Sequence, residues 1–152
     1  MTDFSKSHQD GFFDKLEDHF RELDLSILIN NVGVWYYGPF LDMSPEQCQN
    51  HFLINCLPAT LLTRKVIPYF LKRDKKLKSG IIFMSSILAG SPMKNHTLYN
   101  ATKRYVDYLS RSLSEEFRGK LDILSVRPSF VTTGMIYNFH FPLLSILPEQ
   151  CA

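Results

Sequence analysis

A tyrosine and a lysine, Tyr99 and Lys103, stand four residues apart in a stretch of helical character. On a helix this spacing puts both side chains on one face, about 40° apart around the axis. An ammonium group beside a phenol favours the phenolate and lowers the phenol pKa from about 10. Such a phenol can donate a proton to a carbonyl oxygen, or accept one from an alcohol. The spacing alone is common by chance, and an ordinary pair on a helix surface is the plainer interpretation.

A serine stands where its hydroxyl could act on the same substrate oxygen. Ser86 lies thirteen residues before Tyr99, just after the apolar, branched run 81–84. Such a run predicts a buried strand, so Ser86 is expected at the carboxyl end of that strand. A hydroxyl group placed there can hydrogen-bond the oxygen that Tyr99 protonates.

Three strands and the helices between them must position these side chains. Short apolar runs that predict strands buried on both faces occupy 25–29, 81–84 and 123–126. Helical periodicity covers 11–23, about 44–66 and 102–117. Pro58 is expected to kink or split the second helix, and Gly119 to end the third.

The alternation of buried strands and helices predicts right-handed parallel crossovers and an open α/β sheet. Ligands of such sheets bind beyond the carboxyl ends of the strands. Polar residues follow each predicted strand there, at Asn30-Asn31, Ser85-Ser86 and Arg127-Pro128-Ser129. The sequence therefore places its chemistry at one edge of the sheet.

Composition narrows the class of protein. The 152 residues are 45% hydrophobic, which suits one domain, and the net charge of +2 lacks the bias of a nucleic-acid-binding protein. Three cysteines without CxxC spacing indicate reduced thiols, and five scattered histidines predict no metal site. The polar start and the lack of a long apolar run predict no transmembrane segment, so the chain judged alone is expected in the cytoplasm.

Several spaced elements together resemble the ordered signature of the short-chain dehydrogenase/reductase family. They are Asn30-Asn31-Val32-Gly33, Asn55, Ser86, Tyr99-Asn100-Ala101-Thr102-Lys103 and the run 128–133. The resemblance covers nearly the whole chain. It implies a Rossmann-like doubly wound parallel sheet, with residues 1–152 forming a single, partial domain of that family.

The resemblance implies a role for each matching catalytic residue. Tyr99 would be the acid/base, and Ser86 would orient the substrate oxygen. Lys103 would lower the pKa of Tyr99 and bond the nicotinamide ribose, while Asn55 would hold a water for proton relay.

The resemblance also implies NADP(H) as cofactor. In addition to Tyr99 and Lys103, the matching cofactor-binding residues are Asp3, Asn31, Gly33, Pro128, Val131 and Thr133. Gly33 would also serve a strand-ending turn, where glycine is free to take a positive φ. Ser129 stands where many family members have glycine, which is a mild departure.

Within the family, the Asn-Asn-Val-Gly form is most similar to microsomal 17β-hydroxysteroid dehydrogenases and very-long-chain 3-oxoacyl-CoA reductases. This finer resemblance implies a lipid or steroid substrate and the cytoplasmic face of the endoplasmic reticulum. It also allows a homo-oligomer. The apolar run 139–147 could cover an apolar substrate, and a role in packing within the fold is an equal alternative.

One family element has no counterpart among these residues. The seven glycines contain no TGxxxGxG turn, which holds the cofactor pyrophosphate in full-length members. We therefore expect an incomplete domain, the catalytic half only, truncated at its N-terminus, marginal in stability and inactive alone. The strand 25–29 would expose a free edge. The alternative hypothesis is a non-catalytic interaction protein that docks through its exposed half-sheet.

Overall fold

A computed structural model describes residues 2–74, 76–131, 135 and 145–146 of the chain. The helices are α1 (Phe12–Phe20), α2 (Pro45–Asn55), α3 (Leu57–Lys72) and α4 (Thr97–Glu116), with short 3-10 helices η1 (Phe4–Lys6), η2 (Phe40–Asp42) and η3 (Ile87–Ala89). The strands are β1 (Ile27–Asn30), β2 (Gly80–Met84), β3 (Asp122–Val126), β4 (Phe130–Val131) and β5 (Ser145–Ile146).

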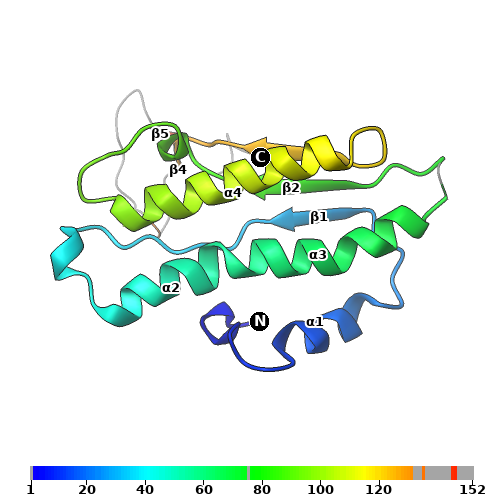
Figure 1. Ribbon diagram of the computed structural model, residues 1–152, viewed down its shortest axis with the longest axis horizontal. Helices are drawn as coiled ribbons and strands as arrows, with labels where there is room; N and C mark the ends of the chain where they lie inside the picture. Colours follow the sequence, from blue (N-terminus) through cyan, green and yellow to red (C-terminus); the bar gives the residue numbers. More distant parts are fainter. Residues whose placement is uncertain (1, 75, 132–134, 136–144, 147–152) are drawn as a thin grey trace.

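The central sheet confirms the predicted parallel α/β architecture. Its order is β1-β2-β3, and both pairings are parallel, with Leu28 opposite Ile81 and Ile81 opposite Ile123. All three arrows in Figure 1 point the same way, so their carboxyl ends meet at one edge. The remaining strands, β4 and β5, form a separate parallel pair.

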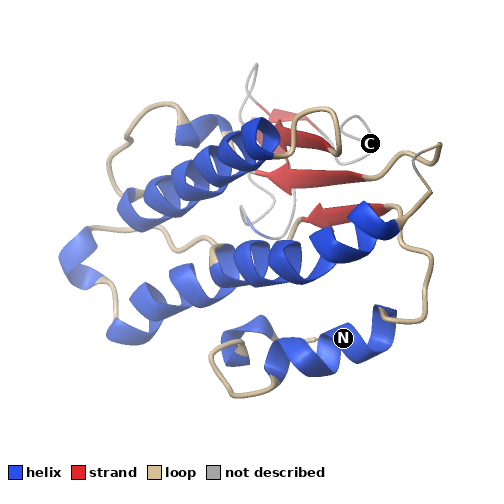
Figure 2. Cartoon of the chain, turned by 45° about the vertical axis from the view of Figure 1, so that its right-hand side comes forward, coloured by secondary structure: helices blue, strands red, loops and turns tan. Residues whose placement is uncertain are grey.

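Helices α3 and α4 run side by side across one face of this sheet (Figures 1 and 2). The buried core between them is apolar and consists of Ala59, Val66, Ile67, Phe70, Ile81, Phe83, Val106 and Leu121. Because side chains alternate along a strand, Ile81 and Phe83 share the face of β2 that meets both helices. Burial of this face holds the two helices in a fixed relation to the sheet.

In the described part of the chain, the opposite face of the sheet carries exposed apolar side chains, so the expectation that the strands are buried on both faces is wrong. Ile27, Ile29 and Leu124 are 58%, 57% and 56% exposed. They occupy neighbouring positions in the register, since Ile29 and Leu124 both lie opposite Ile82. Within the described residues, β1 pairs with β2 alone, so its outer edge is free as expected.

The helical stretch after β1 is split, as the sequence predicts. Helix α2 begins with a capping box in which Ser44 and Gln47 bond each other's backbone amides. It ends at Asn55. Helix α3 begins at Leu57, and Pro58 lies in its first turn. Proline's lack of an N–H costs nothing at this position, because the first amides of a helix have no hydrogen-bond acceptor within the helix. The break places Asn55 at the end of α2.

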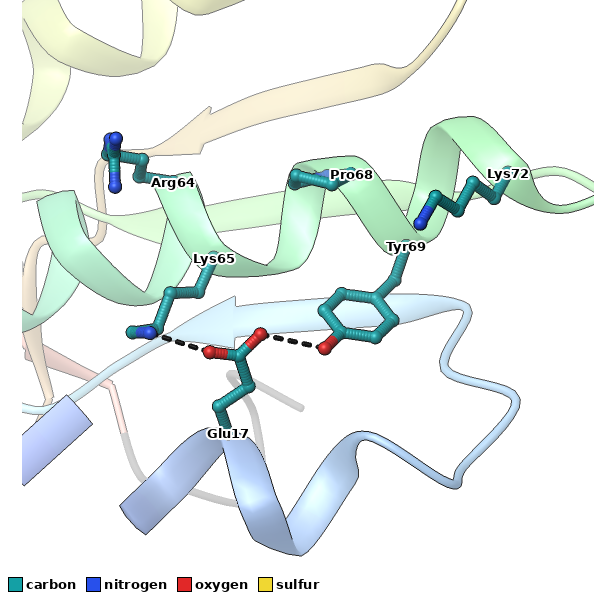
Figure 3. A pocket seen from close by; sticks show the side chains of 6 residues that line it. All are labelled: Glu17, Arg64, Lys65, Pro68, Tyr69 and Lys72. Carbon is teal, nitrogen blue, oxygen red and sulfur yellow. Dashed lines mark hydrogen bonds and ion pairs between the residues drawn. The ribbon is translucent and has the colours of Figure 1, made fainter. Parts of the chain in front are cut away.

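Helix α1 is attached to α3 by polar contacts (Figure 3). Glu17 accepts a bond of 2.6 Å from the Lys65 ammonium and one of 2.7 Å from the Tyr69 hydroxyl. Lys65 also pairs with Asp14 at 2.7 Å. The open hollow between these helices measures about 530 Å³ and has a charged lining, which includes Lys72. It lies on the side of α3 that faces α1.

The residues after Lys72 form the connection from α3 to β2 in its described part, and there the Arg73 Nε donates to Asp24 at 2.6 Å. The apolar run 139–147 lies outside the described residues, apart from the two residues of β5. Across the part of the chain that the structure describes, no helix has both the length and the apolar content to cross a membrane.

Candidate active site

Tyr99 and Lys103 lie in the first two turns of α4, beside the carboxyl edge of the sheet. The Lys103 ammonium is 5.7 Å from the centre of the Tyr99 ring. Ser86 caps η3, two residues after the end of β2, and its side chain lies close enough to the Tyr99 phenol to lower the pKa of that group. The Ser86 hydroxyl also accepts a bond of 3.2 Å from the Leu88 amide. The fold thus brings together three of the residues that the sequence singles out.

Burial raises the pKa of the Tyr99 phenol, and the side chain of Ser86 opposes that rise. Desolvation of the phenolate is the largest cause of this rise. That Lys103 lowers the pKa of Tyr99 remains a prediction. At neutral pH Tyr99 is a neutral phenol, which is the form that donates a proton.

Lys103 is itself an unusual lysine. Its side chain is 6% exposed, and burial lowers its pKa from 10.5 to about 8. The ammonium donates a bond of 2.8 Å to the carbonyl of Met84, the last residue of β2. In addition, the Ser85 hydroxyl donates to the Lys103 carbonyl at 2.8 Å. These two bonds fix α4 against the end of the central strand.

The Asn55 side chain holds the turn after β1. Its amide oxygen accepts a bond of 2.7 Å from the Val34 N–H, and its amide nitrogen donates to the Val34 carbonyl at 3.0 Å. The second amide hydrogen goes to the Thr102 hydroxyl at 3.1 Å. Both donors of the side chain are used, so Asn55 connects α2, α4 and the turn. Its role in holding a water remains a prediction.

Gly33 lies in this turn, and the expectation that it takes a positive φ is wrong. The described glycines with positive φ are Gly11, Gly38 and Gly119. A Cβ at Gly33 would instead lie 3.4 Å from both the Asn55 Oδ1 and the Lys103 Nζ. The bare backbone leaves space beside the ammonium, which a larger side chain would fill.

The other residues predicted to bind the cofactor are spread around this edge. Asn31 is exposed directly after β1. The Pro128 carbonyl accepts a bond of 2.9 Å from the Ile87 amide, so Pro128 lies beside the Ser86 turn. Val131 pairs with Ile146 between β4 and β5. Thr133 lies outside the described residues.

Asp3 has a local role in the structure. Its carboxylate accepts bonds from the Ser5 amide at 3.0 Å and the Ser5 hydroxyl at 2.8 Å, which caps η1. The hydroxyl of Ser7, just after η1, donates to the Leu53 carbonyl of α2 at 2.7 Å. Asp3 therefore begins a short turn that packs on α2, and its contact with a cofactor remains a prediction.

Aromatic side chains pack the segment after Gly33 onto the start of α4. The rings of Trp35 and His96 stack at 5.6 Å, and the Tyr37 ring meets His96 edge-on at 5.2 Å. His96 precedes the first residue of α4, three positions before Tyr99. This packing was not predicted from the sequence, although Trp35 to Tyr37 is its most aromatic run.

Sequence reasoning also missed a buried acid. Asp107 is fully buried on α4, one turn beyond Lys103, and it binds the side chain of Arg127. The spacing of four residues from Lys103 and the apolar neighbour Val106 are the signals that could have revealed it. Over the described ranges, no group of three or more metal-binding side chains gathers in one place.

Comparison with known proteins agrees with this geometry. The family model described as short chain dehydrogenase matches residues 2–140. The chain is 35% identical over 131 residues to the human very-long-chain 3-oxoacyl-CoA reductase, covering 83% of this chain and 41% of that protein. It is 33% identical over 141 residues to the reductase of the same name from Anas platyrhynchos, covering 89% and 43%. The chain thus spans less than half the length of these relatives.

A solved structure shares the fold. The 3-ketoacyl-(acyl-carrier-protein) reductase from Brucella melitensis, complexed with NADH, superposes with a TM-score of 0.75 at 28% identity, over 91% of this chain and 58% of that one. With the parallel sheet, the residues gathered at its carboxyl edge and the family match over most of the chain, the protein belongs to the short-chain dehydrogenase family.

Proposed function

We propose that this site transfers the proton in the NADP(H)-dependent interconversion of a ketone and an alcohol on a long-chain 3-oxoacyl or steroid substrate. One observation carries the proposal. The phenol of Tyr99, the hydroxyl of Ser86 and the ammonium of Lys103 converge at the carboxyl edge of a parallel sheet.

Each side chain has a defined role in the reduction. The substrate carbon gains a hydride, which a bound nicotinamide cofactor supplies, and the substrate oxygen gains the proton of the Tyr99 hydroxyl. Ser86 donates a hydrogen bond to that oxygen as negative charge develops on it. Lys103 offsets the negative charge left on Tyr99 after the transfer.

The residues present fit one part of such a cofactor. The Lys103 ammonium has three hydrogens and, among the described residues, donates to the Met84 carbonyl, so it keeps donors for a ribose hydroxyl. Gly33 approaches that ammonium without a side chain of its own, since a Cβ there would lie 3.4 Å from Lys103 Nζ. We propose that Asn31, Pro128, Val131, Thr133 and Asp3 complete the cofactor contacts, as the family resemblance implies.

The substrate class rests on the relatives and on the apolar surroundings of Ser86. Ile87, directly after Ser86, is 51% exposed, and Met93, before α4, is 46% exposed. Exposed apolar side chains beside a polar reaction centre suit a substrate whose carbonyl is attached to a long hydrocarbon. We also propose NADP(H) over NAD(H), the cytoplasmic face of the endoplasmic reticulum and a homo-oligomer, on the resemblance alone.

A chimera tests the catalytic role directly. The chain is joined behind the N-terminal half of the human very-long-chain 3-oxoacyl-CoA reductase, which supplies a glycine-rich turn, and NADPH oxidation with a 3-oxoacyl-CoA is followed by absorbance. We expect turnover that falls at least about 1,000-fold in Tyr99→Phe, since the proton donor is lost. The matched control is Tyr108→Phe, an exposed tyrosine on the same helix. Equal activity in the two variants would refute the role of Tyr99.

The chain alone is expected to give no turnover. None of its residues forms the TGxxxGxG turn that holds the pyrophosphate in full-length family members. The same absorbance assay, with the isolated chain and 3-oxoacyl-CoA or ketosteroid substrates, checks this expectation. Turnover that disappears in Tyr99→Phe would contradict it and require another way of binding the cofactor.

The exposed sheet face favours a second candidate function, a non-catalytic interaction protein. Ile27, Ile29 and Leu124 are exposed apolar side chains on one face of the sheet, and Ile27 and Ile29 lie on β1, whose outer edge is free among the described residues. Such surfaces mark sites of association. Light scattering coupled to size exclusion separates the candidates, because a stable, folded monomer would remove the reason for proposing a docking function.

A further inference from the structure

Asp107 is a buried charge with an exceptional number of partners. Its side chain is 0% exposed, and Arg127 donates to both of its oxygens, at 2.7 and 2.6 Å. The Ser125 hydroxyl donates at 2.8 Å, and the Arg111 Nε lies 3.1 Å away. The Arg127 guanidinium is the largest cause of a lowered pKa at Asp107, so the carboxylate is charged at neutral pH. A buried charge with this fork geometry fixes the relative position of its two partners.

This ion pair joins the catalytic helix to the end of β3. Asp107 lies one helical turn beyond Lys103, while Arg127 follows the last residue of β3 and precedes Pro128. The Pro128 carbonyl in turn accepts the Ile87 amide at 2.9 Å, directly after Ser86. A continuous series of bonds therefore runs from α4 through β3 to the serine turn.

We propose that Asp107 and Arg127 are positioning residues, which hold the Ser86 turn and the segment beginning at Pro128 in register with Tyr99 and Lys103. Neither touches the reacting atoms. The bidentate bond sets the distance between α4 and the Arg127 backbone, and the bond from Ile87 to Pro128 passes this constraint to Ser86. The importance of this relative position for catalysis rests on the function proposed above. How firmly the Ser86 turn is held against α4 can be measured without turnover.

Arginine and lysine differ in the feature that the proposal requires. A lysine at position 127 keeps the charge but has no planar fork, so it cannot bond both carboxylate oxygens in the same geometry. Arg111 provides a matched control. It also contacts Asp107, but its side chain is 58% exposed and it lies on α4 itself, so its loss leaves the connection to β3 intact.

Native-state amide hydrogen exchange of the full 152-residue chain tests the proposal. We expect the Ile87 amide to exchange on the order of 10- to 100-fold faster in Arg127→Met, because the bidentate bond that holds its acceptor is lost. Arg127→Lys should fall between Arg127→Met and the wild type, and Arg111→Met should match the wild type. Amides at the centre of β2, such as Phe83, should be unaffected in all three variants.

Two results would overturn the proposal. An Ile87 amide with unchanged exchange in Arg127→Met would show that the ion pair does not hold the serine turn. Equal acceleration at Ile87 and Phe83, or loss of folding in both Arg127 variants, would assign the pair to global stability. Since no turnover is measured, failure of the proposed function in the chimera leaves this test intact.

Discussion

Replacing Lys103 with methionine should change how stability depends on pH. Burial holds the pKa of Lys103 at about 8, against 10.5 for an ordinary lysine. Keeping the amine charged in the folded state therefore costs about 3 kcal/mol at neutral pH, at 1.36 kcal/mol per pKa unit. Between pH 8 and 10.5 the unfolded chain binds more protons than the folded chain at this site. The free energy of unfolding should thus rise with pH through this window.

A neighbouring cysteine narrows the useful range of the experiment. Burial raises the pKa of Cys56 from 9.0 to about 11, so the unfolded state loses this proton first as the pH rises above 9. That effect lowers stability and opposes the effect of Lys103. Between pH 8 and 9 Lys103 dominates, and its titration should add about 1 kcal/mol to the free energy of unfolding.

Urea unfolding, followed by the fluorescence of the single tryptophan, Trp35, measures this difference. The wild type should gain about 0.6 kcal/mol from pH 8 to 9, because Cys56 offsets about 0.4 kcal/mol of the gain from Lys103, and Lys103→Met should lack the Lys103 contribution of about 1 kcal/mol. Lys72→Met, which removes an exposed lysine of α3, is the matched control and should retain it. Parallel profiles for the wild type and Lys103→Met would refute the reasoning that Lys103 is a buried charge.

Three further predictions follow from single contacts. Asn55→Ala should lower the free energy of unfolding by about 2–4 kcal/mol in urea titrations, since three hydrogen bonds are lost and the Val34 backbone is left unpaired. A loss below about 1 kcal/mol would contradict this account. Burial lowers the pKa of His51, so stability should fall as the pH drops below 6.5. In acid unfolding followed by circular dichroism, stability should depend less on pH in His51→Gln than in the wild type. Parallel profiles for the two proteins would oppose this prediction. Ile29→Lys should reduce self-association in sedimentation experiments without lowering the unfolding midpoint, whereas Lys72→Met should leave association unchanged.

Much of the scaffold follows from periodicity alone. The strands β2 and β3 lie within one residue of their predicted bounds, and α4 contains the predicted helical face up to Glu116, with Phe117 as its C-cap. The break before Pro58 was expected because proline has no backbone N–H to bond the preceding turn, although α3 accommodates Pro68 in its interior. Burial on both sheet faces was wrong, because an apolar run shows that a strand can be covered but not whether this chain provides the cover.

The candidate site was only partly predictable. The spacing indicates that Tyr99 and Lys103 share a helix face, but it does not show how far solvent reaches the two side chains. The direction of the Tyr99 pKa shift depends on how deeply the phenol is buried, and the spacing does not reveal that depth. Gly33 was misjudged, because close approach to Asn55 and Lys103 involves residues distant in sequence.

The sequence by itself determined the identity and order of the reactive groups, the alternation of strands and helices, and the edge where the polar residues gather. These properties are local, since each depends on residues within one strand or one helical turn. The tertiary structure alone decided the buried state of Lys103, the neutral phenol of Tyr99 and the pairing of Asp107 with Arg127. Desolvation and ion pairing depend on neighbours from other elements, and only the folded chain brings those neighbours within reach.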